Sequence, residues 1–165
     1  MGSEVSHLQE GDLAIVTWVP REPIKGRWAP QPGGVTWNEQ VLNGPTYTWG
    51  EDALVWGGYA VKIDDGSPKD ISSIVGCAVL TGAGAVLHTA KVRPEDSVAV
   101  FGVGGVGLSA LRMAAILNAY PLIAVDLNDE KLDFARKFGA SHVVNASKVD
   151  PVEAIHEITN GGADY

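Results

Sequence analysis

The fold of this 165-residue chain is decided by residues 97–126, which read SVAVFGVGGVGLSALRMAAILNAYPLIAVD. The stretch divides into an apolar strand at residues 97–101, a glycine-rich turn, a helix over residues 105–118 and a second apolar strand at residues 121–125. Apolar strands that alternate with helices at short spacing are typical of a parallel sheet covered by helices. The sequence therefore predicts an α/β fold.

The glycine-rich turn carries a Gly-x-Gly-x-x-Gly pattern formed by Gly102, Gly104 and Gly107. The first glycine permits a tight turn, the second lets the backbone approach a pyrophosphate, and the third allows close packing of helix and strand. The N-terminus of the following helix attracts phosphate charge, so Gly105 and Val106 belong to the same predicted site. This pattern predicts the first half of a Rossmann doubly wound sheet that binds a dinucleotide.

An acidic residue, Asp126, stands at the end of the second strand, where a carboxylate can accept hydrogen bonds from the adenosine ribose hydroxyls. Its charge would repel a 2′-phosphate, and the neighbouring Leu127 offers no arginine to hold one, which favours NAD over NADP. Lys131 is a candidate for the same ribose, with a solvated surface role as its alternative. A methyltransferase that binds S-adenosylmethionine could place glycines and an acid in similar positions, so this alternative stays open.

The elements that follow continue the alternation of helix and strand. Asn128 is suited to cap a helix, and Asp150 followed by Pro151 is suited to begin another. Between these helices we expect a strand at residues 142–144, and after them a fourth strand that starts at residues 163–165.

The first third of the chain has a different texture. Residues 13–19, 46–56 and 59–63 are rich in β-branched and aromatic residues and are predicted strands. Residues 20–45 hold many prolines and glycines and should form loops with at most short strands. All five tryptophans lie in this third, and we interpret them as part of a small β core or an interface, with a carbohydrate platform as the alternative: Trp18, Trp28, Trp37, Trp49 and Trp56.

Small and apolar residues dominate residues 71–90, which predicts a helical connection between two domains. We expect residues 1–90 to form a partial β-rich domain with this linking helix, and residues 91–165 to form a partial Rossmann domain.

Composition limits the partners and the cellular location. Acidic residues outnumber basic ones by 20 to 12, and the net charge of −8 disfavours nucleic acid and anionic membranes. The apolar window at residues 99–117 contains Arg112 and four glycines, which suits a buried strand and helix and argues against a membrane span. Because Cys77 is the single cysteine and no secretion signal is visible, a cytoplasmic location is expected.

Residues 76–85, GCAVLTGAGA, followed by Ala90-Lys91-Val92 and the glycine loop, resemble the zinc-dependent medium-chain alcohol dehydrogenases. The resemblance runs from about Gly11 to the end of the chain and is strongest from residue 76 onward. It implies that the first domain is part of a GroES-like catalytic domain. It further implies roles for four residues: Cys77 as a ligand of the catalytic zinc, Thr81 against the nicotinamide, and Asp126 and Lys131 on the ribose.

The resemblance also implies a reaction, in which zinc polarises a small alcohol and hydride passes to NAD, or the reverse from an aldehyde. The family's other two catalytic-zinc ligands and its four-cysteine structural-zinc lobe have no counterpart here, so we expect a partial chain that is inactive alone. Alternatives are a non-catalytic nucleotide-binding or interaction module and a zinc-free reductase, the latter weakened by Cys77. An unpaired sheet edge would favour a homo-oligomer.

Overall fold

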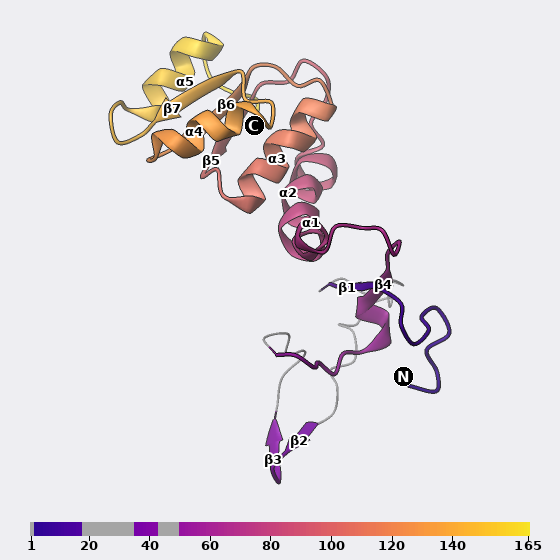
Figure 1. Cartoon of the computed structure of the whole chain (residues 1–165). Helices are drawn as coiled ribbons and strands as arrows, with labels where there is room; N and C mark the ends of the chain where they lie inside the picture. Colours follow the sequence, from indigo (N-terminus) through magenta and orange to yellow (C-terminus); the bar gives the residue numbers. More distant parts are fainter. Residues whose placement is uncertain (1, 18–34, 43–49) are drawn as a thin grey trace. The chain divides into compact units, whose positions relative to one another are not determined.

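The computed structural model describes residues 2–17, 35–42 and 50–165, and its contacts divide the chain into two compact units (Figure 1). The first unit is Met1–Gly76 and the second is Cys77–Tyr165. The division falls earlier than the boundary after residue 90 that the sequence suggested. The helical stretch after Cys77 groups with the parallel-sheet unit because helix α2 (Leu80–Gly84) packs against helix α3 (Gly105–Ile116).

Short antiparallel strand pairs form the sheets of the first unit. Strand β1 (Ala14–Val16) pairs with β4 (Ala60–Lys62), and β2 (Val35–Trp37) pairs with β3 (Gln40–Leu42). A 3₁₀ turn, η1 (Gly57–Tyr59), precedes β4. The predicted strand at residues 59–63 is thus confirmed in its central part.

Two other strand predictions differ from the structure. The strand expected at residues 13–19 is shorter, since only Ala14–Val16 are paired among its described residues, and residues 18 and 19 lie outside them. The strand expected at residues 46–56 is wrong for residues 50–56, which form bends and irregular backbone. Their start, Gly-Glu-Asp, favours a turn, and none of the described strands pairs with them. Residues 46–49 lie outside the described part.

One tryptophan can be placed by its side chain. The Trp56 ring meets the Tyr59 ring edge to face, with centroids 5.4 Å apart, and Tyr59 is buried. This contact agrees with tryptophans filling a small core. The side chains of the other four tryptophans lie outside the described part of the chain.

The helical character predicted for residues 71–90 is confirmed. The helical run begins with α1 (Lys69–Ser73), and α2 lies between two π-helical segments, η2 (Val75–Val79) and η3 (Ala85–Ala90). The run ends at Lys91, whose left-handed φ of 59° stops the helix. No helix among the described residues has the length and apolar character that crossing a bilayer requires.

The second unit contains the predicted parallel sheet, with the strand order β5-β6-β7. Its caps are as predicted: the Asn128 side chain accepts a hydrogen bond from Lys131 N at 3.2 Å, and Asp150 accepts one from Val152 N at 2.8 Å. The remaining elements are β5 (Val98–Phe101), β6 (Leu122–Asp126), α4 (Asp129–Arg136), β7 (His142–Asn145) and α5 (Pro151–Thr159).

Helices cover both faces of this sheet, and the alternation of side chains along β6 explains how (Figure 1). Leu122 and Ala124 point into one cluster with buried residues of α3 and α4, such as Leu111. Ile123 and Val125 point into the other cluster with Ile155 of α5. Because both faces are buried, residues 122–125 of β6 are all apolar, as in parallel strands of this class.

Residues 163–165 continue the sheet beside β5. Ala99 N donates to the Tyr165 carbonyl at 2.8 Å, and Tyr165 N donates to the Ser97 carbonyl at 3.1 Å. Val98 N points the other way, to the Pro121 carbonyl before β6, so these residues lie along the opposite edge of β5. These two bonds place Tyr165 where the sequence predicted the start of a fourth strand, but the assigned sheet has three strands, β5, β6 and β7.

Candidate nucleotide-binding site

The candidate site lies at the carboxyl ends of β5 and β6. The glycine loop follows directly after Phe101, the last residue of β5, and Asp126 is the last residue of β6. Because the two strands are parallel neighbours, their ends meet at one edge of the sheet, which is where ligands bind in open α/β sheets.

The three glycines of the loop meet three different steric demands. Gly102 has a φ of +85°, a left-handed conformation that side chains disfavour. A Cβ on Gly107 would lie 2.0 Å from the Gly102 carbonyl oxygen, so the helix could not sit this close to the loop with any other residue. A Cβ on Gly104 would meet nothing within 4 Å, which leaves open space against the backbone. A pyrophosphate requires such an opening.

Helix α3 begins at this opening, with Gly104 as its N-cap residue and Gly105 and Val106 in its first turn. All three residues are exposed. The first N–H groups of a helix have no partner within it and carry partial positive charge, so they suit an anion. The predicted phosphate residues are therefore brought together and face solvent.

Asp126 binds the backbone on both of its sides. One carboxylate oxygen, Oδ2, accepts a hydrogen bond from Val103 N in the glycine loop at 3.0 Å. The other, Oδ1, accepts from Leu127 N at 2.8 Å and from Asn128 N at 3.2 Å. The carboxylate thus joins the end of β6 to the glycine loop and to the start of α4.

These hydrogen bonds keep Asp126 ionised. The bond from Val103 N is the largest cause that lowers its pKa below the ordinary value, and those from Asn128 and Leu127 act in the same direction against partial burial. The charge of Lys131 lowers the pKa of Asp126 further. The site therefore presents a fixed negative charge beside a loop that attracts phosphate, as one ribose and one pyrophosphate would require.

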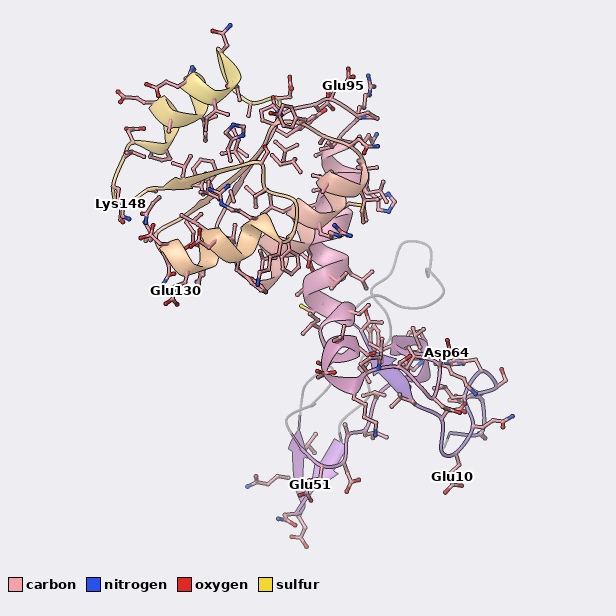
Figure 2. The ribbon with its side chains drawn as sticks, turned by 45° about the horizontal axis from the view of Figure 1, so that its top comes forward. Glu10, Glu51, Asp64, Glu95, Glu130 and Lys148 are labelled. Atoms are coloured by element: carbon pink, nitrogen blue, oxygen red, sulfur yellow. The ribbon has the colours of Figure 1, made fainter. Side chains whose placement is uncertain are left out.

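A second polar cluster fixes the neighbouring loop at the same edge of the sheet. Asp129, the first residue of α4, accepts a hydrogen bond from Asn145 Nδ2 at 2.7 Å. It also forms an ion pair with Lys148 Nζ at 2.6 Å. Figure 2 shows Lys148 near the start of α4, where Glu130 is labelled. Both partners of the ion pair are 61% exposed, so the cluster positions a loop at the surface and contributes little to stability.

Thr81 and Cys77 lie on the helical run that packs beside the loop. A Cβ on Gly82 would lie 2.2 Å from the Val106 carbonyl oxygen, so α2 contacts the first turn of α3 at backbone distance and places the exposed Thr81 next to it. Cys77 is exposed and free.

The described residues do not form a complete site for the zinc ion that the family resemblance implied. No three histidine, cysteine, aspartate or glutamate side chains gather there as a metal site requires. A catalytic zinc takes three protein ligands, and the described residues offer Cys77 without the other two. Zinc therefore does not fit these residues by themselves.

The contact of Val103 with Asp126 is the part of the site that sequence reasoning missed. Val103 is only 2% exposed. In the Gly-x-Gly-x-x-Gly pattern it is the undefined position between the first two glycines, so the pattern predicted no contact for it. The two other donors were foreseeable, because an Asp side chain commonly binds the backbone N–H two residues ahead. A bond between residues 23 positions apart leaves no local signal.

The parallel sheet, the glycine loop at a helix N-terminus and the acid at the end of the next strand define a fold of the Rossmann type. Comparison with known proteins identifies the family within this class. A family model described as zinc-binding dehydrogenase matches residues 105–165. The benzyl alcohol dehydrogenase of Acinetobacter calcoaceticus superposes with a TM-score of 0.83 at 30% identity, covering 99% of this chain and 50% of that one.

Sequence relatives agree with the structural ones. Alcohol dehydrogenase 1 of Pisum sativum is 42% identical over 72% of this chain, and an S-(hydroxymethyl)glutathione dehydrogenase of Saccharomyces cerevisiae is 41% identical over 72%. The chain spans about a third of the length of these relatives, 32% in both cases. The chain belongs to the zinc-dependent medium-chain alcohol dehydrogenase family.

Proposed function

We propose that residues 77–165 bind the adenosine diphosphate portion of NAD(H) and serve the cofactor half of an NAD-linked alcohol dehydrogenase. The observation that carries this proposal is the open space over Gly104, at the N-terminus of α3, beside the ionised Asp126. The first turn of α3 would hold the pyrophosphate, with Gly105 and Val106 contributing backbone N–H groups. Asp126 would accept a ribose hydroxyl, with Lys131 beside it.

The charge of Asp126 favours NAD over NADP. A 2′-phosphate on the ribose would lie against a carboxylate whose pKa is lowered by Val103 N–H, and so against a permanent negative charge. Leu127, which follows Asp126, is 68% exposed and provides no cation to hold that phosphate. The proposal therefore includes preference for the cofactor without the 2′-phosphate.

The substrate side of the proposal rests on family membership. A small alcohol or aldehyde would exchange hydride with the nicotinamide ring, against which Thr81 is placed by the resemblance. Cys77 would supply one ligand to a zinc ion, whose chemistry is to polarise the alcohol oxygen. Because the described residues do not complete that zinc site, we expect no alcohol oxidation from this 165-residue chain alone. A cytoplasmic location and association of copies through an open sheet edge belong to the same proposal.

The experiment that tests the cofactor assignment is calorimetric titration of the whole chain with NADH, NADPH and S-adenosylmethionine. We expect saturable binding of NADH, at least about tenfold weaker binding of NADPH, and no heat from S-adenosylmethionine. Asp126→Ala should abolish the NADH signal. Asp129→Ala is the matched control, because it removes a neighbouring carboxylate that contacts Asn145 and Lys148 and leaves the glycine loop untouched.

Two outcomes would contradict the proposal. Equal affinity for NADH and NADPH would remove the discriminating role of Asp126, and absence of binding to either would refute a cofactor site in this chain. A second function, a nucleotide-binding module without catalysis, is favoured by the incomplete zinc ligand set. Like the first proposal, it predicts NADH binding with no absorbance change at 340 nm when this chain alone is supplied with NAD, added zinc and primary alcohols, so formation of NADH would contradict both.

A further inference from the structure

We propose that Asp126 is also a positioning residue, whose carboxylate holds the glycine loop in its phosphate-binding shape before any nucleotide arrives. This inference rests on the proposed function, because it assigns a second task to a residue of the same site. It starts from the hydrogen bond that Val103 N donates to Asp126 Oδ2 at 3.0 Å.

The neighbouring attachments of the loop are a backbone hydrogen bond at Gly102 and the packing of the Val103 side chain. Gly102 N donates to the Val125 carbonyl at 2.7 Å, which ends the ladder between β5 and β6. The chain then turns through the positive φ of Gly102 and places the Val103 side chain in the core, 2% exposed. The Val103 N–H is the last backbone group that the sheet holds before Gly104, so its partner sets the direction in which the loop leaves the strand.

A carboxylate is well suited to this task. Hydrogen bonds from a backbone N–H to an ionised oxygen are about twice as strong as neutral ones. An ionised carboxylate has about four acceptor positions, and three of those on Asp126 are filled by Val103, Leu127 and Asn128. One position remains on the oxygen that faces the loop, so a ribose hydroxyl can bind while the loop stays held.

The functional consequence is preorganisation. A loop that is already fixed loses less conformational freedom when a pyrophosphate binds, and a ligand gains affinity when its site needs no ordering. Asp126 should therefore strengthen the binding of a nucleotide even when that nucleotide offers it no hydroxyl group. A residue that acts only as a ribose acceptor would not have this effect, and this difference makes the proposal testable.

The test compares Asp126→Asn with the wild-type chain, using ADP and 2′,3′-dideoxy-ADP as ligands. The amide retains the size of the carboxylate, but it loses the charge and one acceptor oxygen. We expect the variant to bind ADP about 10- to 100-fold more weakly and to bind the dideoxy ligand about tenfold more weakly. Asp129→Asn, the matched control, should bind both ligands within about twofold of wild type.

Hydrogen exchange gives a readout that needs no ligand. In the wild-type chain the Val103 amide should exchange at least about tenfold more slowly than the Gly104 amide, which sits at the open helix N-terminus. In Asp126→Asn the Val103 amide should lose most of this protection, while amides of the buried α3 residue Ala114 keep theirs. The wild-type comparison stands even if the variant does not fold.

Two results would overturn the inference. The first is an unchanged affinity of Asp126→Asn for the dideoxy ligand together with a clear loss for ADP, because Asp126 would then act through the ribose alone. The second is a wild-type Val103 amide that exchanges as fast as that of Gly104. Failure of the proposed function has a different signature, since wild type would bind neither nucleotide while Val103 stayed protected.

Discussion

Replacing Gly107 by alanine tests the steric reasoning behind the glycine loop most directly. The added Cβ would lie 2.0 Å from the Gly102 carbonyl oxygen, 3.1 Å from its carbonyl carbon and 3.3 Å from Val100 Cγ1. Real Cβ atoms essentially never approach another heavy atom closer than 3.0 Å. The obstructing atoms belong to the backbone of the loop, so the helix or the loop would have to move by about 1 Å for ordinary contact distances to return.

The expected cost follows from this overlap. Overpacking a core typically costs about 1–3 kcal/mol, and a clash with the backbone belongs at the upper end, so we expect about 3 kcal/mol. For a unit of this size each kcal/mol lowers the melting temperature by about 4–8 °C, which predicts a fall of roughly 12–24 °C. Circular dichroism at 222 nm is a suitable assay because most of the described helices, α2 to α5, belong to the second unit.

The matched control is the same substitution three residues earlier. A Cβ on Gly104 would meet nothing within 4 Å, and the φ of −79° suits alanine, so Gly104→Ala should cost less than about 1 kcal/mol. Its methyl group would instead fill the space proposed for the pyrophosphate and abolish NADH binding. The reasoning is refuted if Gly107→Ala melts within about 2 °C of wild type, or if Gly104→Ala binds NADH normally.

Two further predictions concern the second unit. Leu111 is fully buried between α3 and the sheet, so Leu111→Ala should lower the free energy of unfolding, measured with urea, by about 3–5 kcal/mol. Leu127 is 68% exposed, so Leu127→Ala should change this free energy by less than about 0.5 kcal/mol. Equal losses in the two variants would contradict the assigned core. Acid should destabilise the chain, because hydrogen bonds from the Ser97 hydroxyl and backbone lower the pKa of Asp164, as those from Val103 and its neighbours lower that of Asp126. For a lowered carboxyl pKa the stabilisation is present above the unfolded value of about 3.8 and is lost as pH falls through the folded value, so melting temperature should drop between about pH 5 and pH 2.5. Asp164→Asn should melt with a shallower pH dependence over this window, and an unchanged slope would count against the assignment.

Local chemistry explains why much of the second unit could be predicted from the sequence. The caps Asn128 and Asp150 lie next to the helices they begin, and their side chains bind backbone groups two or three residues away. The apolar character of residues 122–125 reflects burial on both faces, which is a property of each residue in the strand. Such signals lie within a few residues of their effects, so the order of strands and helices could be derived before the structure was known.

The first unit shows where this reasoning fails. Residues 50–56 contain aromatic and β-branched residues that favour a strand, yet they form irregular backbone. Residues 60–62, Ala-Val-Lys, carry a weaker strand signal and do form a strand, because Ala14–Val16 provide hydrogen-bonding partners. A β-strand is stabilised by its neighbours across the sheet, and sequence composition does not say which neighbours will be there.

The sequence by itself determined the parallel sheet, the glycine loop, the acid at the end of β6 and the family resemblance, because each depends on residue type at short spacing. Tertiary structure alone decided that residues 77–90 pack with the parallel-sheet unit, since Gly82 approaches the Val106 backbone only after α2 and α3 have met. It also decided that Asp126 binds the Val103 amide. Both contacts join groups more than twenty residues apart, and folding brings such groups together through the packing of the whole unit.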